Sequence, residues 1–85
     1  MEKVPIEELE KKLKEARKRS VGSKWRHYKG GQYVISGISI MEATNEIAVI
    51  YSPLENPDVS FVRPITVWAE LVEWNGKMVP RFSKI

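Results

Sequence analysis

The chain has 85 residues, so it forms one small domain that buries only about 60% of the surface exposed by its unfolded form. It contains no cysteine and a single histidine, which excludes a disulfide framework, a thiolate metal site and a multi-histidine metal site. Fourteen lysines and arginines against eleven acids give a net charge of +3, a mild bias toward anionic partners.

The first expected element is an amphipathic helix from Pro5 to about Lys18. Apolar residues recur there at spacings of three and four, with charged residues between them: Ile6, Leu9, Leu13 and Ala16. Pro5 suits the first helical position, where its missing N–H group costs no hydrogen bond. The apolar stripe is expected to pack either on the rest of the chain or on the same stripe of a second copy. We therefore separate a helix and linker, residues 1–22, from a β domain, residues 23–85.

After Gly22 the sequence changes to short β-branched and aromatic runs separated by turn signals. The expected strands are Trp25–Lys29, Tyr33–Met41, Glu46–Ser52, Val59–Arg63, Leu71–Trp74 and Lys77–Phe82. Asn75-Gly76 is the strongest hairpin signal, because a type I′ turn needs positive φ at both positions. Gly37 inside a strand indicates a bulge or a bend. The predicted fold class is mainly β, a roll or partly open barrel of five to six antiparallel strands after one N-terminal helix.

Two tryptophans follow Pro64 in the sequence. Large rings near chain corners usually fill the core, so we expect Trp68 to be buried. Trp74 lies directly before the predicted hairpin turn. It is expected to be exposed, unless it packs across the hairpin on Met78 or Val79.

Cations and aromatic rings are interleaved at three places in the β domain. These places are Trp25-Arg26-His27-Tyr28-Lys29, Phe61-Val62-Arg63 and Val79-Pro80-Arg81-Phe82. Because side chains alternate across a strand, Arg26 shares a face with Tyr28, and Arg63 shares one with Phe61. An arginine beside a ring can stack on a flat ligand and donate a fork of hydrogen bonds to an anion. The alternative is that the rings fill the core while each arginine reaches solvent or pairs with a nearby acid.

The sequence gives little support to catalysis. His27 has no serine or carboxylate in a nucleophile context, and Glu70 and Glu73 fall on opposite faces of an extended segment. Gly30-Gly31 permits an anion-binding backbone, but a tight turn between strands explains the same residues. We therefore expect no enzyme, no catalytic residue, no metal and no cofactor.

The stretch from about Gly22 to Ile85 resembles a bacterial and phage family, domain of unknown function 1653. The family's motifs, roughly RHYKG, Y, VVY, WVRP and GK-VPRF, are matched here in order. The resemblance implies a small Src-homology-3-like (SH3-like) β-roll and no known reaction. The sequence departs from the pattern at Phe61, where the family has tryptophan, and in the loop around Asn56-Pro57. Matched positions without established roles include Arg26, His27, Tyr28, Lys29, Gly30, Tyr33, Tyr51, Arg63, Pro64, Gly76, Lys77, Pro80, Arg81 and Phe82.

These observations predict a non-enzymatic binding module for an anionic, flat-faced ligand. The ligand class is a nucleotide or a short nucleic acid, and sequestration of a nucleotide signal is one use of such a site. The expected ligand-binding residues are Arg26, His27, Tyr28, Lys29, Tyr51, Arg63 and Arg81. The alternative is a protein-interaction or assembly module in which the rings form a hydrophobic hot spot.

The association state and location are also predicted. A short core and a helix of only four apolar stripe residues lead us to expect a homodimer. No apolar run approaches the roughly 20 residues that cross a bilayer, and the acidic N-terminal segment does not resemble a signal peptide. We therefore expect no membrane partner and a cytoplasmic location, in the host cytoplasm if the chain is phage-encoded.

Overall fold

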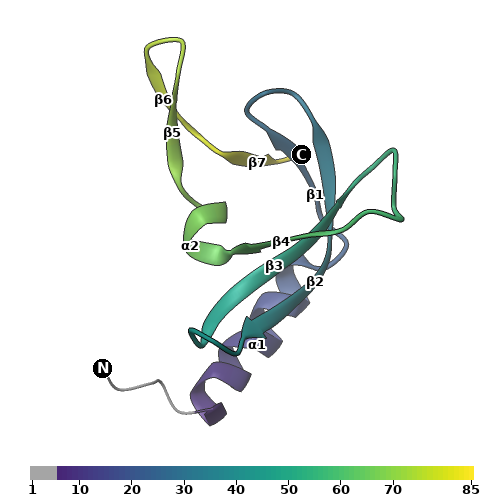
Figure 1. Cartoon of the computed structure of the whole chain (residues 1–85), viewed down its shortest axis with the longest axis vertical. Coiled ribbons are helices and arrows are strands. Elements are labelled where there is room, and N and C mark those ends of the chain that lie inside the picture. Colours follow the sequence, from purple (N-terminus) through teal and green to yellow (C-terminus); the bar gives the residue numbers. More distant parts are fainter. Residues whose placement is uncertain (1–5) are drawn as a thin grey trace.

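The computed structural model describes residues 6–85 and confirms a mainly β fold after one N-terminal helix (Figure 1). A five-stranded antiparallel sheet has the order β4-β3-β2-β1-β7, and β5 and β6 form a separate two-stranded sheet. The five-stranded sheet ends in two free edges, so the roll is partly open, as predicted. The elements are α1 (Ile6–Ser20), β1 (Lys24–His27), β2 (Gln32–Met41), β3 (Glu46–Pro53), β4 (Phe61–Pro64), α2 (Ile65–Trp68), β5 (Leu71–Trp74), β6 (Lys77–Pro80) and β7 (Phe82–Lys84).

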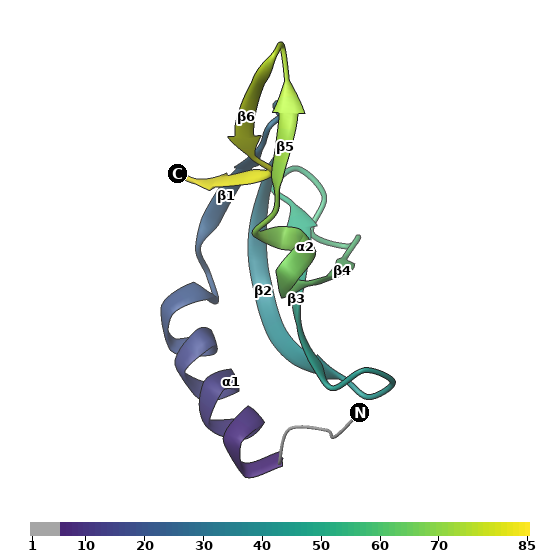
Figure 2. The ribbon, with the colours of Figure 1, turned by 90° about the vertical axis from the view of Figure 1, so that its left-hand side faces the viewer.

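Helix α1 lies alongside β2 (Figure 2). Leu9 and Leu13 are buried there, and the Nε of Arg17 donates a hydrogen bond to the carbonyl oxygen of Ile38 at 3.0 Å. Leu9, Leu13 and Ala16 of the apolar stripe therefore pack within their own chain. The predicted start at Pro5 lies outside the described residues. Within residues 6–85, no helix has the length and apolar character that crossing a bilayer requires.

A β-bulge near Gly37 keeps the core face of β2 continuous. The register against β3 shifts between Ile35 and Gly37, which confirms the predicted irregularity. Ile35 pairs with Tyr51 and, past the bulge, Ile38 pairs with Val49. Because a bulge inserts one extra residue, Ile38 stays on the face of Ile35 instead of turning to the opposite one. Both isoleucines consequently enter the core.

Helix α2 brings Trp68 into the core. The indole stacks on the ring of Phe82, with centroids 3.7 Å apart and planes 6° apart, and Trp68 is buried as predicted. This helical turn falls between the predicted strands Val59–Arg63 and Leu71–Trp74, where the sequence pattern indicated no element. The buried core cluster comprises Leu13, Ile35, Ile38, Val49, Tyr51, Trp68 and Phe82.

The last predicted strand, residues 77–82, is divided at Arg81. β6 pairs with β5, whereas β7 pairs with β1 in the main sheet. The amide of Arg81 donates a hydrogen bond to the carbonyl oxygen of Glu70 at 2.9 Å and fixes this crossover. The β5–β6 hairpin projects from the rest of the molecule (Figure 2). Its turn has φ values of 54° at Asn75 and 79° at Gly76, as a type I′ turn requires.

Candidate ligand-binding site

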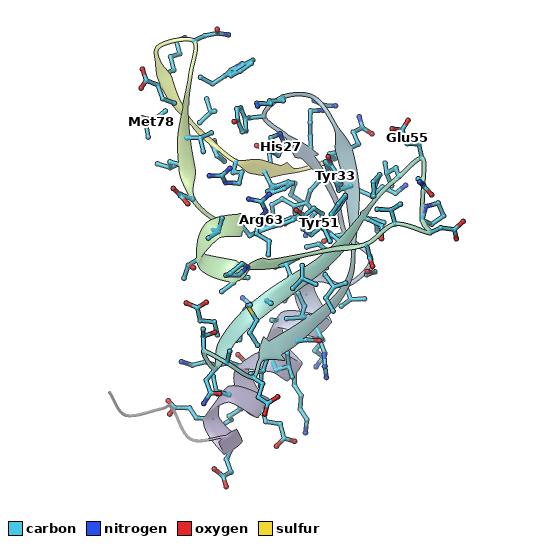
Figure 3. All side chains as sticks on the ribbon, viewed as in Figure 1. His27, Tyr33, Tyr51, Glu55, Arg63 and Met78 are labelled. Atoms are coloured by element: carbon cyan, nitrogen blue, oxygen red, sulfur yellow. The ribbon has the colours of Figure 1, made fainter. Side chains whose placement is uncertain are left out.

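A pocket of about 190 Å³ is built from the side chains of all five strands of the main sheet. We call it the ring pocket. Figure 3 shows four of its residues gathered near the centre of the upper half of the molecule. The lining residues are His27 from β1, Tyr33 from β2, Tyr51 from β3, Phe61 and Arg63 from β4, and Phe82 from β7.

The rings of this pocket pack mainly edge to face. The buried ring of Tyr51 lies 5.5 Å from Tyr33 and 5.6 Å from Phe82, at interplanar angles of 75° and 72°. Such geometry is the favourable one for aromatic pairs, so the inner wall is rigid. Phe61 lies 5.6 Å from Tyr51 and remains 44% exposed. Phe61 therefore forms the rim of the pocket.

Arg63 provides the cation of the ring pocket. Its Nε donates a hydrogen bond to the Tyr51 hydroxyl at 3.1 Å, and its guanidinium lies 5.8 Å from the centroid of the Phe82 ring. The ion pairs found within residues 6–85 join Glu10 to Lys14 and Glu70 to Arg81, so no described carboxylate neutralises Arg63. The guanidinium plane is held from two sides, and the donors on its two Nη atoms are not used by an acid.

His27 is surrounded by positive charge. Burial, followed by the charges of Arg63, Arg81 and Lys29, holds the pKa of His27 below its ordinary value of 6.5. Its Nδ1 accepts a hydrogen bond from the Lys29 amide at 3.1 Å, which places the proton of the neutral ring on Nε2. No described carboxylate pairs with this histidine. An anion bound beside His27 would therefore be attracted by these cations.

Arg81 differs from Arg63 because a local acid accompanies it. Its Nη2 lies 3.7 Å from the Glu70 carboxylate, and its buried Nε has no hydrogen-bond partner among the described residues. The side chain contributes to the field at His27, but it lines neither the ring pocket nor the groove described next. Arg81 thus follows in part the alternative expectation of pairing with an acid.

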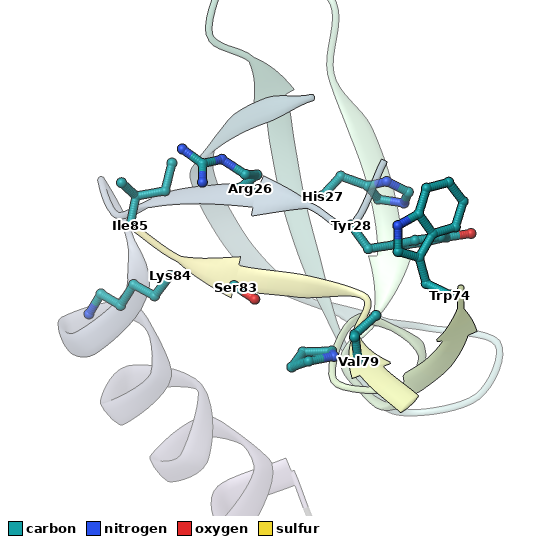
Figure 4. A pocket seen from close by; sticks show the side chains of 9 residues that line it. Arg26, His27, Tyr28, Trp74, Val79, Ser83, Lys84 and Ile85 are labelled. Atoms are coloured by element: carbon teal, nitrogen blue, oxygen red, sulfur yellow. The ribbon is translucent and has the colours of Figure 1, made fainter. Parts of the chain in front are cut away.

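A second concavity, of about 440 Å³, lies between the β1–β7 strand pair and the β5–β6 hairpin (Figure 4). We call it the hairpin groove. The rings of Tyr28 and Trp74 meet edge to face at one end, with centroids 5.3 Å apart. His27 lines both the groove and the ring pocket, so the two cavities adjoin at this residue. The other residues of the groove are Arg26, Val79, Pro80, Ser83, Lys84 and Ile85.

The structure divides the predicted site residues between these cavities. His27, Tyr51 and Arg63 line the ring pocket, and Arg26 and Tyr28 line the hairpin groove together with His27. Lys29 and Arg81 lie near His27 without lining either cavity.

Several site residues were missed because their side chains meet only through strand pairing. Tyr33 and Phe82 join the ring pocket through the partners of β1, and Lys84 enters the groove because β7 returns to that strand. Phe61 and Phe82 belong to the segments of interleaved rings and cations but were not among the expected ligand-binding residues, and Tyr33 lies outside those segments. Within residues 6–85, no group of three or more potential metal ligands is present.

The fold and these cavities define a small open β-roll with an N-terminal helix and a cavity lined by rings and cations on its main sheet. The chain belongs to the protein family of unknown function DUF1653, whose sequence model matches residues 23–84. The resemblance seen in the motifs is thereby confirmed. A crystal structure of a DUF1653 protein from Bordetella bronchiseptica is similar, with a TM-score of 0.67 and 28% sequence identity over 82% of this chain and 92% of that chain. Comparison with curated proteins gives no match.

Proposed function

We propose that the chain is a non-enzymatic binding module whose ring pocket holds the anionic, flat-faced part of a nucleotide or short nucleic acid. The observation that carries the proposal is Arg63, a half-buried guanidinium that a hydroxyl and a ring orient and no described acid neutralises. A volume of about 190 Å³ is below the range of about 300–1,000 Å³ typical of pockets for whole drug-sized ligands. The pocket therefore suits one planar group of a larger ligand.

The charge of the pocket decides between an anionic and a cationic ligand. Several aromatic rings around a small cavity can also bind a quaternary ammonium group through cation–π contacts. Here Arg63 already occupies the position over the Phe82 ring, and burial followed by the charges of three cations lowers the pKa of His27. A cationic ligand would be repelled by these groups, whereas an anion would be attracted. The proposal is therefore limited to anionic ligands.

Titration calorimetry with the four common nucleoside monophosphates tests the proposal. Arg63→Ala is expected to weaken binding about tenfold or more, since a hydrogen bond to a charged group contributes about 1.5–3 kcal/mol. Arg63→Lys should bind with intermediate affinity because it keeps the charge and loses the planar fork. The matched control is Arg19→Ala, which removes the same charge from an exposed position of α1. Absence of binding to every nucleotide, or an equal loss in the control, would reject the proposal.

A second candidate function, protein interaction, is favoured by the outer face of the hairpin. Leu71 and Met78 are 54% and 63% exposed, and the strand register places them on one face with Pro80 and the charged Glu73. Exposed apolar patches of this kind mark interfaces. Ionic strength separates the candidates, because counterion release makes nucleic-acid binding fall steeply with salt whereas an apolar interface loses much less. A pull-down from cell extract, with and without nuclease, separates partners held through nucleic acid from partners held by direct protein contact.

The homodimer remains a prediction, and the same exposed face is the surface that a second copy would cover. Light scattering across a concentration series tests it. A dimer mass that falls in Met78→Asp would support self-association through the hairpin. A monomer mass at the highest concentration would contradict it.

A further inference from the structure

The hairpin groove carries charge at one end and aromatic rings at the other (Figure 4). Arg26, Lys84 and the apolar Ile85 lie at the charged end, and none of the described residues lining the groove is acidic. The two cations extend from opposite faces of the β1–β7 pair, because Arg26 pairs with Ser83 and Lys84 pairs with Trp25. Neither cation takes part in the ion pairs found within residues 6–85. Their charges are therefore available to a ligand. A groove that combines exposed rings with unpaired cations is typical of surfaces that follow a nucleic-acid backbone.

The ring end of the groove is suited to stacking. Trp74 is 43% exposed, although it is one of the largest apolar side chains of the chain. The neighbouring Tyr28 ring meets it at 73°, which fixes the indole from one side. The adjoining type I′ turn further restrains the backbone beside Trp74. An exposed and restrained indole can accept any base, because every base has a π-face.

The groove also continues the ring pocket. His27 belongs to the lining of both cavities, with Arg63 on the pocket side and Tyr28 on the groove side. Arg26 lies in β1, whereas Tyr28 lies in the turn that follows it, where its ring is 4.4 Å from the His27 ring. Rings and cations are thus repeated on both sides of the histidine. Two neighbouring units of a polyanion can lie along this surface.

We propose that the hairpin groove binds the nucleotide next to the one in the ring pocket, so that the ligand is a single-stranded nucleic acid of at least two nucleotides. This inference rests on the function proposed for the ring pocket. The strand must be single because bases stacked inside a duplex cannot enter a pocket or stack on Trp74. Stacking and backbone contacts give little base discrimination, so binding is expected to tolerate different sequences.

Binding of thymidine monophosphate, its dinucleotide and its hexanucleotide to the full chain tests the inference. The hexanucleotide is expected to bind at least tenfold more tightly than the mononucleotide. Trp74→Ala should remove this gain, and Trp74→Phe should retain part of it. The matched control is Met78→Ala, an exposed apolar residue on the opposite face of the same hairpin.

The outcomes separate this inference from the function on which it rests. Equal affinities for the mononucleotide and the hexanucleotide, or a gain that survives Trp74→Ala, would overturn the groove and leave the ring pocket standing. Hexanucleotide binding that is insensitive to Arg63→Ala would reject the ring pocket and with it the two-nucleotide arrangement. Competition by hexaglutamate as strong as that by the hexanucleotide would show an acidic peptide site and overturn the assignment to nucleic acid. A steep fall in hexanucleotide affinity with salt is the expected companion result.

Discussion

The main sheet and the β5–β6 hairpin are both antiparallel, yet they differ in what covers them. On the main sheet Ile35, Ile38 and Val49 are almost completely buried under α1, α2 and the aromatic core. On the hairpin Leu71 and Met78 remain largely exposed. Similar apolar strand residues are thus buried in one region and exposed in the other. Strand character alone does not decide burial; the elements packed against the strand do.

This contrast predicts that the hairpin groove changes shape more easily than the ring pocket. An isolated two-stranded hairpin is marginally stable in water, so this one depends on its turn and on contacts such as Tyr28 with Trp74. The ring pocket instead has walls from five hydrogen-bonded strands. Regions with few buried apolar contacts open at low free-energy cost. We therefore expect a preformed ring pocket beside a groove whose hairpin wall can adjust to its ligand.

The largest expected effect on stability comes from removing an aromatic ring from the core that covers the main sheet. Phe82→Ala should lower the free energy of unfolding by about 3–5 kcal/mol, because it removes the ring that stacks on Trp68 and leaves a cavity. The hairpin counterpart, Met78→Ala, should change it by less than about 0.5 kcal/mol. Urea denaturation measures both values. Similar losses in the two variants would contradict the contrast between the regions.

Replacing glycine by alanine tests the difference between the hairpin and the main sheet at the level of the backbone. Gly76→Ala should destabilise by about 1–2 kcal/mol, because Gly76 has a φ of 79° that L-residues rarely adopt. Gly37→Ala should be nearly neutral, since an added Cβ would lie 3.5 Å from Ile50 Cδ1, an ordinary van der Waals contact. Hydrogen exchange should place the loss at Gly76 in the amides of β5 and β6. Protection lost equally in the main sheet would show that the hairpin does not open separately.

These glycines also show which features the sequence could reveal. The turn at Asn75-Gly76 and the bulge at Gly37 depend on local backbone preferences, so short patterns were sufficient to predict them. The division at Arg81 depends on which strand each half pairs with, and alternation is the same for either partner. The same distinction between local patterns and strand pairing applies to the candidate site. Rings and cations close in sequence were found, whereas Tyr33 enters the pocket only through the register of β2.

Removal of one hydroxyl from the ring pocket should have a moderate effect. Tyr51→Phe is expected to lower the free energy of unfolding by about 1 kcal/mol, the usual net value of a hydrogen bond, because Arg63 Nε loses its acceptor. Tyr28→Phe in the groove should be nearly neutral, since no side-chain hydrogen bond involves its hydroxyl in the part of the chain that the structure describes. Thermal unfolding of both variants measures the difference. A neutral Tyr51→Phe would show that the rings alone position Arg63.

The smallest expected effect is a pH dependence at His27. Its pKa in the folded chain lies below the unfolded value of 6.5, so the unfolded chain takes up the proton first as the pH falls. The contribution of His27 to the free energy of unfolding is therefore present above about pH 6.5 and is lost as the pH falls toward the folded-state pKa. The variant His27→Gln should remove this pH dependence of stability. An anion bound at Arg63 should raise the pKa of His27, since it compensates the cations around the ring. The chain has one histidine, so its imidazole NMR signal reports both changes without ambiguity. A pKa unchanged by saturating nucleotide would place the ligand away from the ring pocket.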